Sequence, residues 1–309
     1  MADSAGIVAR LGGSFPAVVT PFHDDESLDL ESLATLLEWL FARDMRGFTL
    51  LGSSAENTYL TAEERTRIVQ CAKRLLGDRV TLLVGVILFG TRAAVEEGKR
   101  LRDCGADALM VALPQYYVTP LAEVVAHYGA IVRDVGLPVV YYHYPDPTHL
   151  RLTPEEVARL FAEVDLCGIK NSNLDIGDLK AQLGAIERPI RMFAGQSFSF
   201  LEALKSRAVG AICPVACLMP KTSVALHSAF EAGDLARAKE LQSALFRALP
   251  AVMPEAGPAG PVGVPHAGVK EALVTAGILR SAKVRLPQPG LSDGKRLEVR
   301  DLAPKIVEA

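Results

Sequence analysis

The chain has 309 residues, half of them apolar, and its formal net charge is −3. This composition excludes wholesale disorder, and the absence of any Lys/Arg block argues against a nucleic-acid or anionic-membrane partner. No apolar run reaches the roughly 18 residues of a membrane span, and Arg10 interrupts the short N-terminal stretch Gly6–Ala9, so we expect a cytoplasmic protein without a membrane segment.

Short apolar runs recur along the chain, and each is followed by a polar or Gly/Pro step and then by helical spacing. Because the runs are apolar throughout, without polar alternation, they are typical of parallel strands covered on both faces. The predicted strands are Phe15–Thr20, Gly47–Leu51, Val80–Val86, Ala108–Leu113, Leu137–Tyr142, Leu166–Lys170, Ile190–Ala194 and Val209–Pro214.

Amphipathic segments between these runs predict helices. Thr61 with Glu64 three residues later has the spacing of a capping box. Thr153 stands directly before Pro154, and proline is favoured at the first position of a helix. The clearest predicted helices are Asp29–Arg43, Thr61–Leu76, Thr91–Cys104, Leu121–Val135 and Pro154–Val164.

Eight strands, each followed by a helical pattern, predict a (β/α)8 TIM barrel over about residues 10–220. The alternative is a doubly wound open sheet. That fold would carry a G-x-G-x-x-G turn after its first strand, where this chain has Thr20-Pro21-Phe22-His23.

The strand pattern stops near Lys221, and helical patterns continue at His227–Leu249 and Val269–Leu279. Between them, the Pro/Gly/Ala-rich stretch Pro250–Pro265 reads as a connecting loop. We therefore expect one domain over residues 1–309, with a C-terminal helical extension of about residues 221–309 on the barrel.

Polar residues cluster where several predicted strands end. A barrel enzyme builds its site from the carboxyl ends of its strands, so these residues are candidates for a shared site. They include no Asp/Glu pair suited to hydrolysis. The clusters are Gly52-Ser53-Ser54-Ala55-Glu56, Pro114-Gln115-Tyr116-Tyr117, Tyr141-Tyr142-His143-Tyr144-Pro145, Lys170-Asn171-Ser172-Asn173 and Gly195-Gln196-Ser197.

Lys170 is the most informative of these residues, because it ends an apolar strand and would stand in the mouth of the barrel. Desolvation lowers the pKa of an amine, and a neutral amine attacks a carbonyl to form a Schiff base. A lysine that reaches solvent or pairs with a carboxylate is the structural alternative. Tyrosines at neighbouring strand ends favour the catalytic interpretation, since imine formation needs a proton shuttle.

The turn Gly52-Ser53-Ser54 offers successive backbone N–H groups and two hydroxyls, which suit a carboxylate. An ordinary serine helix cap is the alternative. His127, His143 and His149 lack matching carboxylates, and Cys213 with Cys217 forms a lone C-x3-C pair, so we expect no metal site.

Five motifs occur in the order expected of one family. They are Gly52-Ser53-Ser54-Ala55-Glu56, Tyr116-Tyr117, Tyr142-His143-Tyr144-Pro145, Gly168-Ile169-Lys170 and Gly210-Ala211-Ile212. From about Phe15 to Leu286 the chain resembles the dihydrodipicolinate synthase / N-acetylneuraminate lyase family of class I aldolases.

The resemblance implies a role for each matching residue. Lys170 would form the Schiff base with pyruvate or a pyruvate-like 2-oxo acid, and Tyr142 would be the general acid/base. Ser54 would relay protons between Tyr142 and a second tyrosine. Tyr117 matches that second tyrosine, which in synthase members comes from the neighbouring subunit.

The same resemblance implies how substrate binds. Ser53 and Ser54 would hold the carboxylate of the 2-oxo acid, and the backbone at Ile212 would line its pocket. An aldehyde is the implied second substrate, a homodimer or homotetramer is the implied assembly, and no organic cofactor is needed because the lysine is the electron sink.

The chain departs from the synthase pattern where the second substrate binds. Pro147 stands where synthases carry an arginine that holds a carboxylate, and losing such a charge-assisted pair is a large change. Arg151 is a possible replacement. These departures leave the pyruvate half of the site intact and the other half altered.

Smaller departures are Ala55 for glycine, His143 for asparagine and His149 for the closing glycine, while Asn171-Ser172-Asn173 resembles lyase and sugar-acid aldolase members. The primary hypothesis is thus a Schiff-base lyase or aldolase. 4-Hydroxy-tetrahydrodipicolinate synthase and a sugar-acid dehydratase are alternatives on the same site. A catalytically silent relative that binds a small acid is the alternative from another class.

Overall fold

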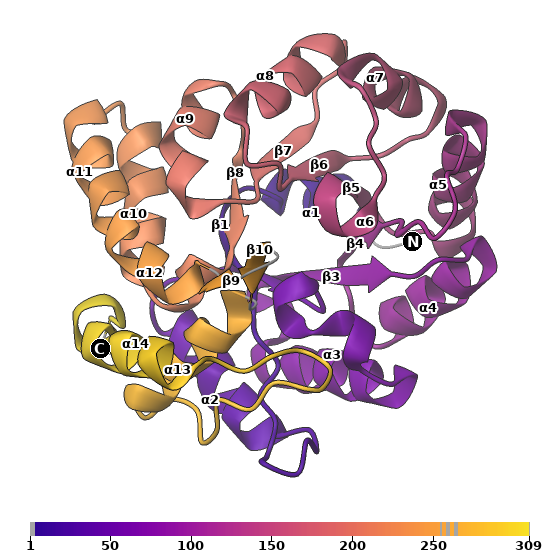
Figure 1. The fold of residues 1–309 in the computed structure, drawn as a ribbon. Helices are drawn as coiled ribbons and strands as arrows, with labels where there is room; N and C mark the ends of the chain where they lie inside the picture. The colour runs from indigo at the N-terminus through magenta and orange to yellow at the C-terminus, as the bar shows by residue number, and fades with distance from the viewer. Residues whose placement is uncertain (1–3, 254, 258–259, 263–264, 309) are drawn as a thin grey trace.

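Eight parallel strands close into a barrel in the computed structural model, which describes residues 4–253, 255–257, 260–262 and 265–308 (Figure 1). They are β1 Gly13–Pro16, β2 Gly47–Leu50, β3 Thr81–Ile87, β4 Ala108–Ala112, β5 Val139–His143, β6 Gly168–Asn171, β7 Arg191–Ala194 and β8 Gly210–Cys213. From β2 to β8 each strand pairs with the next in sequence, and β1 pairs with β8. A bridge between Ala17 and Thr49 joins β1 to β2. The predicted TIM barrel is confirmed, because an open doubly wound sheet would leave its first and last strands apart.

Helices surround the barrel, as Figure 1 shows. The capping box predicted at Thr61 forms, and the helix start predicted at Thr153 is also a capping box. Among the described residues, none of the helices has the length and apolar character needed to cross a bilayer. The helices between strands are α2 Leu30–Phe41, α3 Ala62–Leu76, α4 Thr91–Asp103, α5 Leu121–Val135, α6 Pro145–Thr148, α7 Pro154–Glu163, α8 Ile176–Ala185 and α9 Phe200–Lys205.

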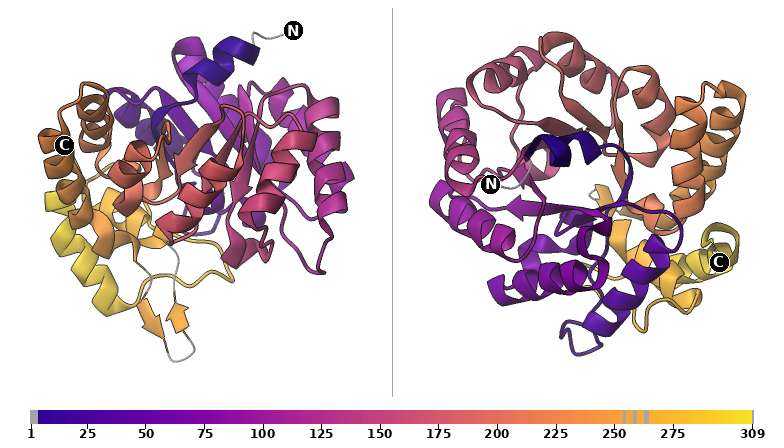
Figure 2. Two further views of the ribbon diagram at one scale, coloured as in Figure 1. Left: turned by 90° about the horizontal axis from the view of Figure 1, so that it is seen from above. Right: turned by 180° about the vertical axis from the view of Figure 1, so that it is seen from behind.

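A second cluster of apolar side chains fills the inside of the barrel, separate from the layer between strands and helices. Because side chains alternate along a strand, every second residue faces this interior. The short helix α1 (Ser4–Arg10) crosses one end of the barrel, where Ile7 joins the interior cluster (Figure 2). That cluster also includes Phe15, Leu83, Met110, Val140, Tyr142, Phe193 and Ile212.

The C-terminal part is helical, as predicted, but its helices differ from the sequence prediction. The single helix expected at 227–249 is two helices, because Gly233 takes a positive φ of 78° and Asp234 caps the second. The last helix was not predicted. The helices are α10 Pro220–Glu231, α11 Leu235–Leu245, α12 Leu249–Val252, α13 Pro265–Thr275 and α14 Asp293–Ile306.

The stretch predicted as a connecting loop, Pro250–Pro265, contains an antiparallel hairpin of β9 (Glu255–Gly257) and β10 (Gly260–Val262). The loop prediction was wrong there, since Pro and Gly disfavour strands but do not prevent a short ladder at a tight reversal. Its positions 254, 258–259 and 263–264 lie outside the described residues. The hairpin projects from the end of the barrel opposite α1 (Figure 2).

A buried ion pair joins α13 to the mouth of the barrel. The Nζ atom of Lys270 lies 2.5 Å from Oε1 of Glu56, and both side chains are buried. Lys270 also donates to the carbonyl of Lys283, and the amide of Arg285 donates to Glu56. Removing one partner of such a pair typically costs about 3–5 kcal/mol, so Glu56 fixes the loop after β2 against the C-terminal helices.

Candidate active site

A cavity of about 500 Å³ opens at the carboxyl ends of the strands. Residues from the loops after β2 to β8 line it, together with His266 at the start of α13. This is the end at which (β/α)8 barrels place their active sites. The cavity brings together Ser53, Ser54, Tyr142 and Lys170 of the predicted site residues.

Lys170 projects from β6 into this cavity. It pairs in register with Tyr142 on β5 and with Phe193 on β7, both members of the interior cluster. Its Nζ lies 4.2 Å from the centre of the Tyr142 ring. Among the described residues no carboxylate lies within ion-pair distance of this amine, and burial lowers its pKa to about 7. Lys170 therefore loses its proton far more readily than an exposed lysine does.

Tyr142 provides a buried phenol beside the amine. Its hydroxyl lies 3.3 Å from the hydroxyl of Ser53, and its ring stacks on Tyr144 with centroids 5.5 Å apart. Burial raises the pKa of Tyr142, and the hydroxyls of Ser53 and Ser172 partly offset that effect. A phenol kept neutral and hydrogen-bonded to a second hydroxyl is suited to proton transfer.

The loop after β2 presents the two serines to the cavity from a short 3-10 turn, Ser53–Ala55. The turn stands between two residues with left-handed backbone, Leu51 and Glu56. The backbone just before the turn packs against Gly85 on β3, where any Cβ would lie only 2.0 Å from the carbonyl oxygen of Leu51. The serine next to the Tyr142 hydroxyl is Ser53, whereas the resemblance implied that Ser54 holds that position.

Tyr117 and Ile212 lie away from the cavity wall. The Tyr117 side chain is 79% exposed and packs edge-on against Tyr116, which is also exposed. Ile212 is fully buried inside the barrel, and Pro214, two residues later, lines the cavity instead. Within one chain, the structure therefore does not bring Tyr117 to Tyr142.

The structure places the residues at which the chain departs from the family pattern. Pro147 lies on α6 and lines the cavity, whereas Arg151 is exposed and pairs with the exposed Asp146 at 2.7 Å. Arg151 thus does not replace the missing arginine at the cavity wall. His149 ends α6 with a positive φ of 58°, a conformation that glycine adopts without strain and that histidine adopts only occasionally.

His143 and Asn171 face away from the cavity, toward α8. His143 lies 3.3 Å from Asp178 and contacts the Tyr141 hydroxyl at 3.1 Å, while Asn171 donates to Asp178 at 2.7 Å. Burial raises the pKa of the Asp178 carboxyl, but the hydrogen bonds from His143 and Asn171 outweigh it and the pKa is lowered. These residues join β5 and β6 to α8, and none of them lines the cavity.

The sequence analysis did not name several polar residues of the cavity wall, among them His266, Gln288 and Tyr59. His266 comes from α13, and Gln288 and Tyr59 hydrogen-bond each other across the rim at 2.5 Å. No local sequence pattern predicts these wall residues, because their positions depend on how the C-terminal segment packs over the loop after β2. Glu56 was visible in its motif, but its partner Lys270 was not.

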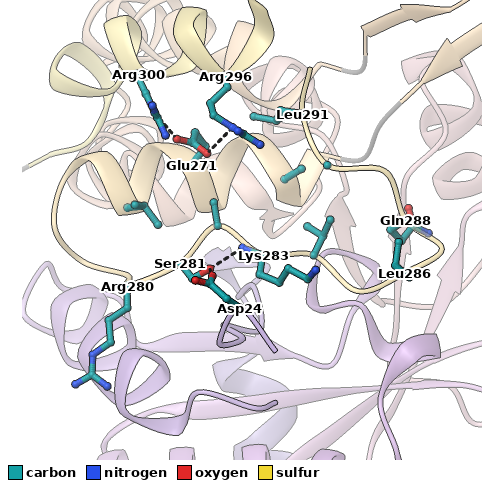
Figure 3. Close-up of a pocket in the computed structure, with 15 residues that line it drawn as sticks. Asp24, Glu271, Arg280, Ser281, Lys283, Leu286, Gln288, Leu291, Arg296 and Arg300 are labelled. Atoms are coloured by element: carbon teal, nitrogen blue, oxygen red, sulfur yellow. Dashed lines mark hydrogen bonds and ion pairs between the residues drawn. The ribbon is translucent and has the colours of Figure 1, made fainter. Parts of the chain in front are cut away.

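A second cavity of about 430 Å³ lies between α13, α14 and residues 280–291 (Figure 3). Arg296 and Arg300 point toward the buried Glu271, and Arg280 points away from it. The carboxylate at its centre is already neutralised by these guanidinium groups. Its lysine, Lys283, pairs with Glu26, whereas the barrel cavity holds the buried amine of Lys170 without a described ion-pair partner, so the barrel cavity is the candidate active site.

Comparison with known proteins shows which family the chain matches. A model described as the dihydrodipicolinate synthetase family matches residues 10–306. The 4-hydroxy-tetrahydrodipicolinate synthase of Methanoculleus marisnigri is 30% identical over 291 residues, which cover 93% of this chain and 97% of that protein. An uncharacterized DapA-like lyase of Halobacterium salinarum is 32% identical over 304 residues, covering 98% and 96% of the two chains.

The fold matches a solved structure over most of its length. The crystal structure of YagE, a prophage protein of E. coli K12 in complex with pyruvate, superposes with a TM-score of 0.87. The two chains are 26% identical, and the match covers 95% of this chain and 98% of YagE. YagE is described as belonging to the dihydrodipicolinic acid synthase family.

Proposed function

Because the chain belongs to the dihydrodipicolinate synthetase family, we propose that it is a class I lyase that forms a Schiff base between Lys170 and a pyruvate-like 2-oxo acid. The observation that carries this proposal is a buried amine with a pKa of about 7 and no carboxylate beside it among the described residues. The pyruvate complex of YagE supports the choice of acid. A cytoplasmic location stays a prediction from the sequence.

The chemistry that this amine supports is an aldol addition or its reverse. The neutral Nζ of Lys170 attacks the keto carbon of pyruvate, and uptake of one proton with loss of one water leaves a protonated Schiff base. Loss of a methyl proton gives an enamine, whose carbon bonds to the aldehyde carbon while the aldehyde oxygen takes up a proton. One water then hydrolyses the Schiff base and releases the hydroxy-oxo acid and the free amine.

Tyr142 is positioned to move these protons. Its hydroxyl is close to Ser53 and its ring lies beside the Nζ of Lys170. We assign the relay contact with Tyr142 to Ser53, and we keep Ser53 and Ser54 together as the binding turn for the carboxylate. The backbone at Ile212 remains a proposed wall of the acid pocket beneath the cavity.

A second copy of the chain would complete the site. Four exposed apolar side chains lie close together after β3 and β4, and exposed patches of this kind mark interaction surfaces. Tyr117 is one of them. When two subunits dock through this patch, Tyr117 of one subunit brings its hydroxyl to the cavity of the other. We therefore propose a homodimer or homotetramer. The patch consists of Phe89, Tyr116, Tyr117 and Val118, with exposed fractions between 65% and 94%.

The second candidate function is 4-hydroxy-tetrahydrodipicolinate synthase, since relatives at about this distance carry that name. Pro147 disfavours it, because the cavity wall then lacks the guanidinium that would bind a carboxylate of the second substrate. A catalytically silent relative would share the fold and the family. Formation of a Schiff base on Lys170 distinguishes an enzyme from such a relative.

Borohydride reduction in the presence of pyruvate should leave a carboxyethyl group on Lys170, detected by mass spectrometry of the peptide that contains it. Lys170→Ala should fold normally and give no adduct, while the control Lys239→Ala, at an exposed helix position, should react like wild type. Wild-type protein that takes up no adduct at saturating pyruvate would refute the Schiff-base mechanism.

Tyr142→Phe should lower kcat by roughly 10²–10⁴, the usual effect of removing an acid/base group, with little change in the melting temperature. Ser53→Ala should lower kcat more than Ser54→Ala does, because Ser53 carries the contact with the phenol. Steady-state rates with pyruvate and an aldehyde measure both effects. An unchanged rate in Tyr142→Phe would remove this residue from the mechanism.

Subunit mixing tests whether Tyr117 serves the neighbouring site. Lys170→Ala and Tyr117→Phe should each be weakly active or inactive alone. In a hybrid dimer one site regains both groups, so mixed and reassembled subunits should recover about a quarter of wild-type activity if a two-fold dimer forms. No recovery after proven subunit exchange would show that Tyr117 does not act across the interface.

A further inference from the structure

The walls of the active-site cavity carry almost no charge. Among the described residues that line it there is no Asp, Glu or Arg, and its ammonium-type group is Lys170, which the proposed chemistry consumes. The undescribed positions between 254 and 264 are Pro, Ala, Gly and Val in the sequence, so they add no charge. The cavity therefore offers no fixed ion to pair with a charged second substrate.

Charged side chains on the segments that border the cavity wall are held by partners of their own. Lys270 is held by Glu56, and Arg285 donates two hydrogen bonds to Glu64 while lying over the Phe22 ring. Each of these cations already has an anionic partner. A carboxylate in the cavity would therefore gain a cationic partner only by breaking one of these existing pairs. Such pairs are costly to break from one side.

The upper wall of the cavity is apolar and partly aromatic. The rings of Phe89 and Tyr144, from the loops after β3 and β5, give this wall flat apolar faces, which favour an apolar body over a fully hydrated one. Phe89 is 65% exposed at the rim and the Tyr144 ring stacks on Tyr142. The residues that form this wall are Ile87, Phe89, Pro114, Tyr144, Pro147 and Pro214.

One polar side chain of the wall has a hydrogen-bonding atom to spare. His266 is buried, with an exposed fraction of 4%, and its Nε2 has no hydrogen-bond partner among the described residues. The nearest carboxylate oxygen, on Glu56, lies 3.8 Å away and is held by Lys270. A buried polar atom without a partner is costly, so it is expected to bind a ligand group or water.

We propose that the second substrate is an uncharged aldehyde with an apolar body, and that its far polar group hydrogen-bonds to Nε2 of His266. This inference rests on the proposed function, in which the aldehyde carbon bonds to the enamine formed on Lys170. Burial lowers the pKa of the His266 ring to about 3, so the imidazole is neutral at pH 7 and does not attract an anion. The turn at Ser53 and Ser54 is taken by the carboxylate of the 2-oxo acid, so a second carboxylate, on the aldehyde, would lose hydration without a compensating ion.

The test uses aldehydes matched in length, each with saturating pyruvate. The probes are 4-oxobutanoate, which carries a carboxylate, its uncharged amide 4-oxobutanamide, aspartate semialdehyde, and butanal. The amide should be used with kcat/KM at least about tenfold above the carboxylate, since an unpaired charge is costly to desolvate. Equal or better use of either charged aldehyde would overturn the proposal, as would failure of both uncharged aldehydes to react.

Pro147→Arg places a guanidinium at an exposed position of the cavity wall and should shift the ratio toward the carboxylate by about tenfold. Pro147→Gln is the matched control of similar reach without charge, and it should leave the ratio within about twofold. If the ratio of kcat/KM for the amide to that for the carboxylate does not change in Pro147→Arg, the aldehyde does not bind beside Pro147.

His266→Phe keeps a ring but removes Nε2, and it should lower kcat/KM for the amide several-fold more than for butanal. His266→Asn should restore part of the difference and covers the case in which Phe does not fold. An equal loss for both aldehydes would assign His266 a structural role only. Borohydride trapping of pyruvate is measured in parallel: absent trapping refutes the proposed function, whereas normal trapping with a preference for charged aldehydes refutes only this inference.

Discussion

Burial of one amine without a counter-ion is the constraint on which the site depends. Lys170 lies on a barrel strand between Tyr142 and Phe193, and no described carboxylate reaches it. In water a lysine keeps its proton at pH 7, and only desolvation makes the neutral, nucleophilic form accessible. The barrel supplies that desolvation by packing apolar residues beneath the amine, and the tyrosine pair covers it from the side.

The ionic groups of the mouth are arranged so that they do not disturb this amine. Glu56 is the nearest acidic residue of the loop that carries the serines, and Lys270 holds it from α13. The C-terminal helices therefore do more than lengthen the chain, because they neutralise a carboxylate at the mouth and add His266 to the cavity. The same neutrality that protects the amine restricts the charge of what enters beside it.

The eight strands and the place of Lys170 were predictable, because apolar runs with helical spacing between them repeat around a closed barrel and strand ends converge by topology. The hairpin at Glu255–Val262 and the break at Gly233 were not, since short elements depend on turn geometry more than on composition. The choice of Ser53 over Ser54 beside Tyr142 depends on the 3-10 turn, which the residue types alone do not specify. His266 and Lys270 could not be placed either, because only tertiary packing brings α13 over the mouth.

The most direct test is a titration of the lysine side chains of the ligand-free protein by heteronuclear NMR, with Lys170→Ala to assign the signal. Lys170 should titrate near pH 7, while solvent-exposed lysines titrate at about pH 10.4. In that case the amine is substantially neutral at physiological pH and ready to attack a carbonyl. A Lys170 signal that titrates with the exposed lysines would contradict the central claim, since the barrel would then leave this amine protonated.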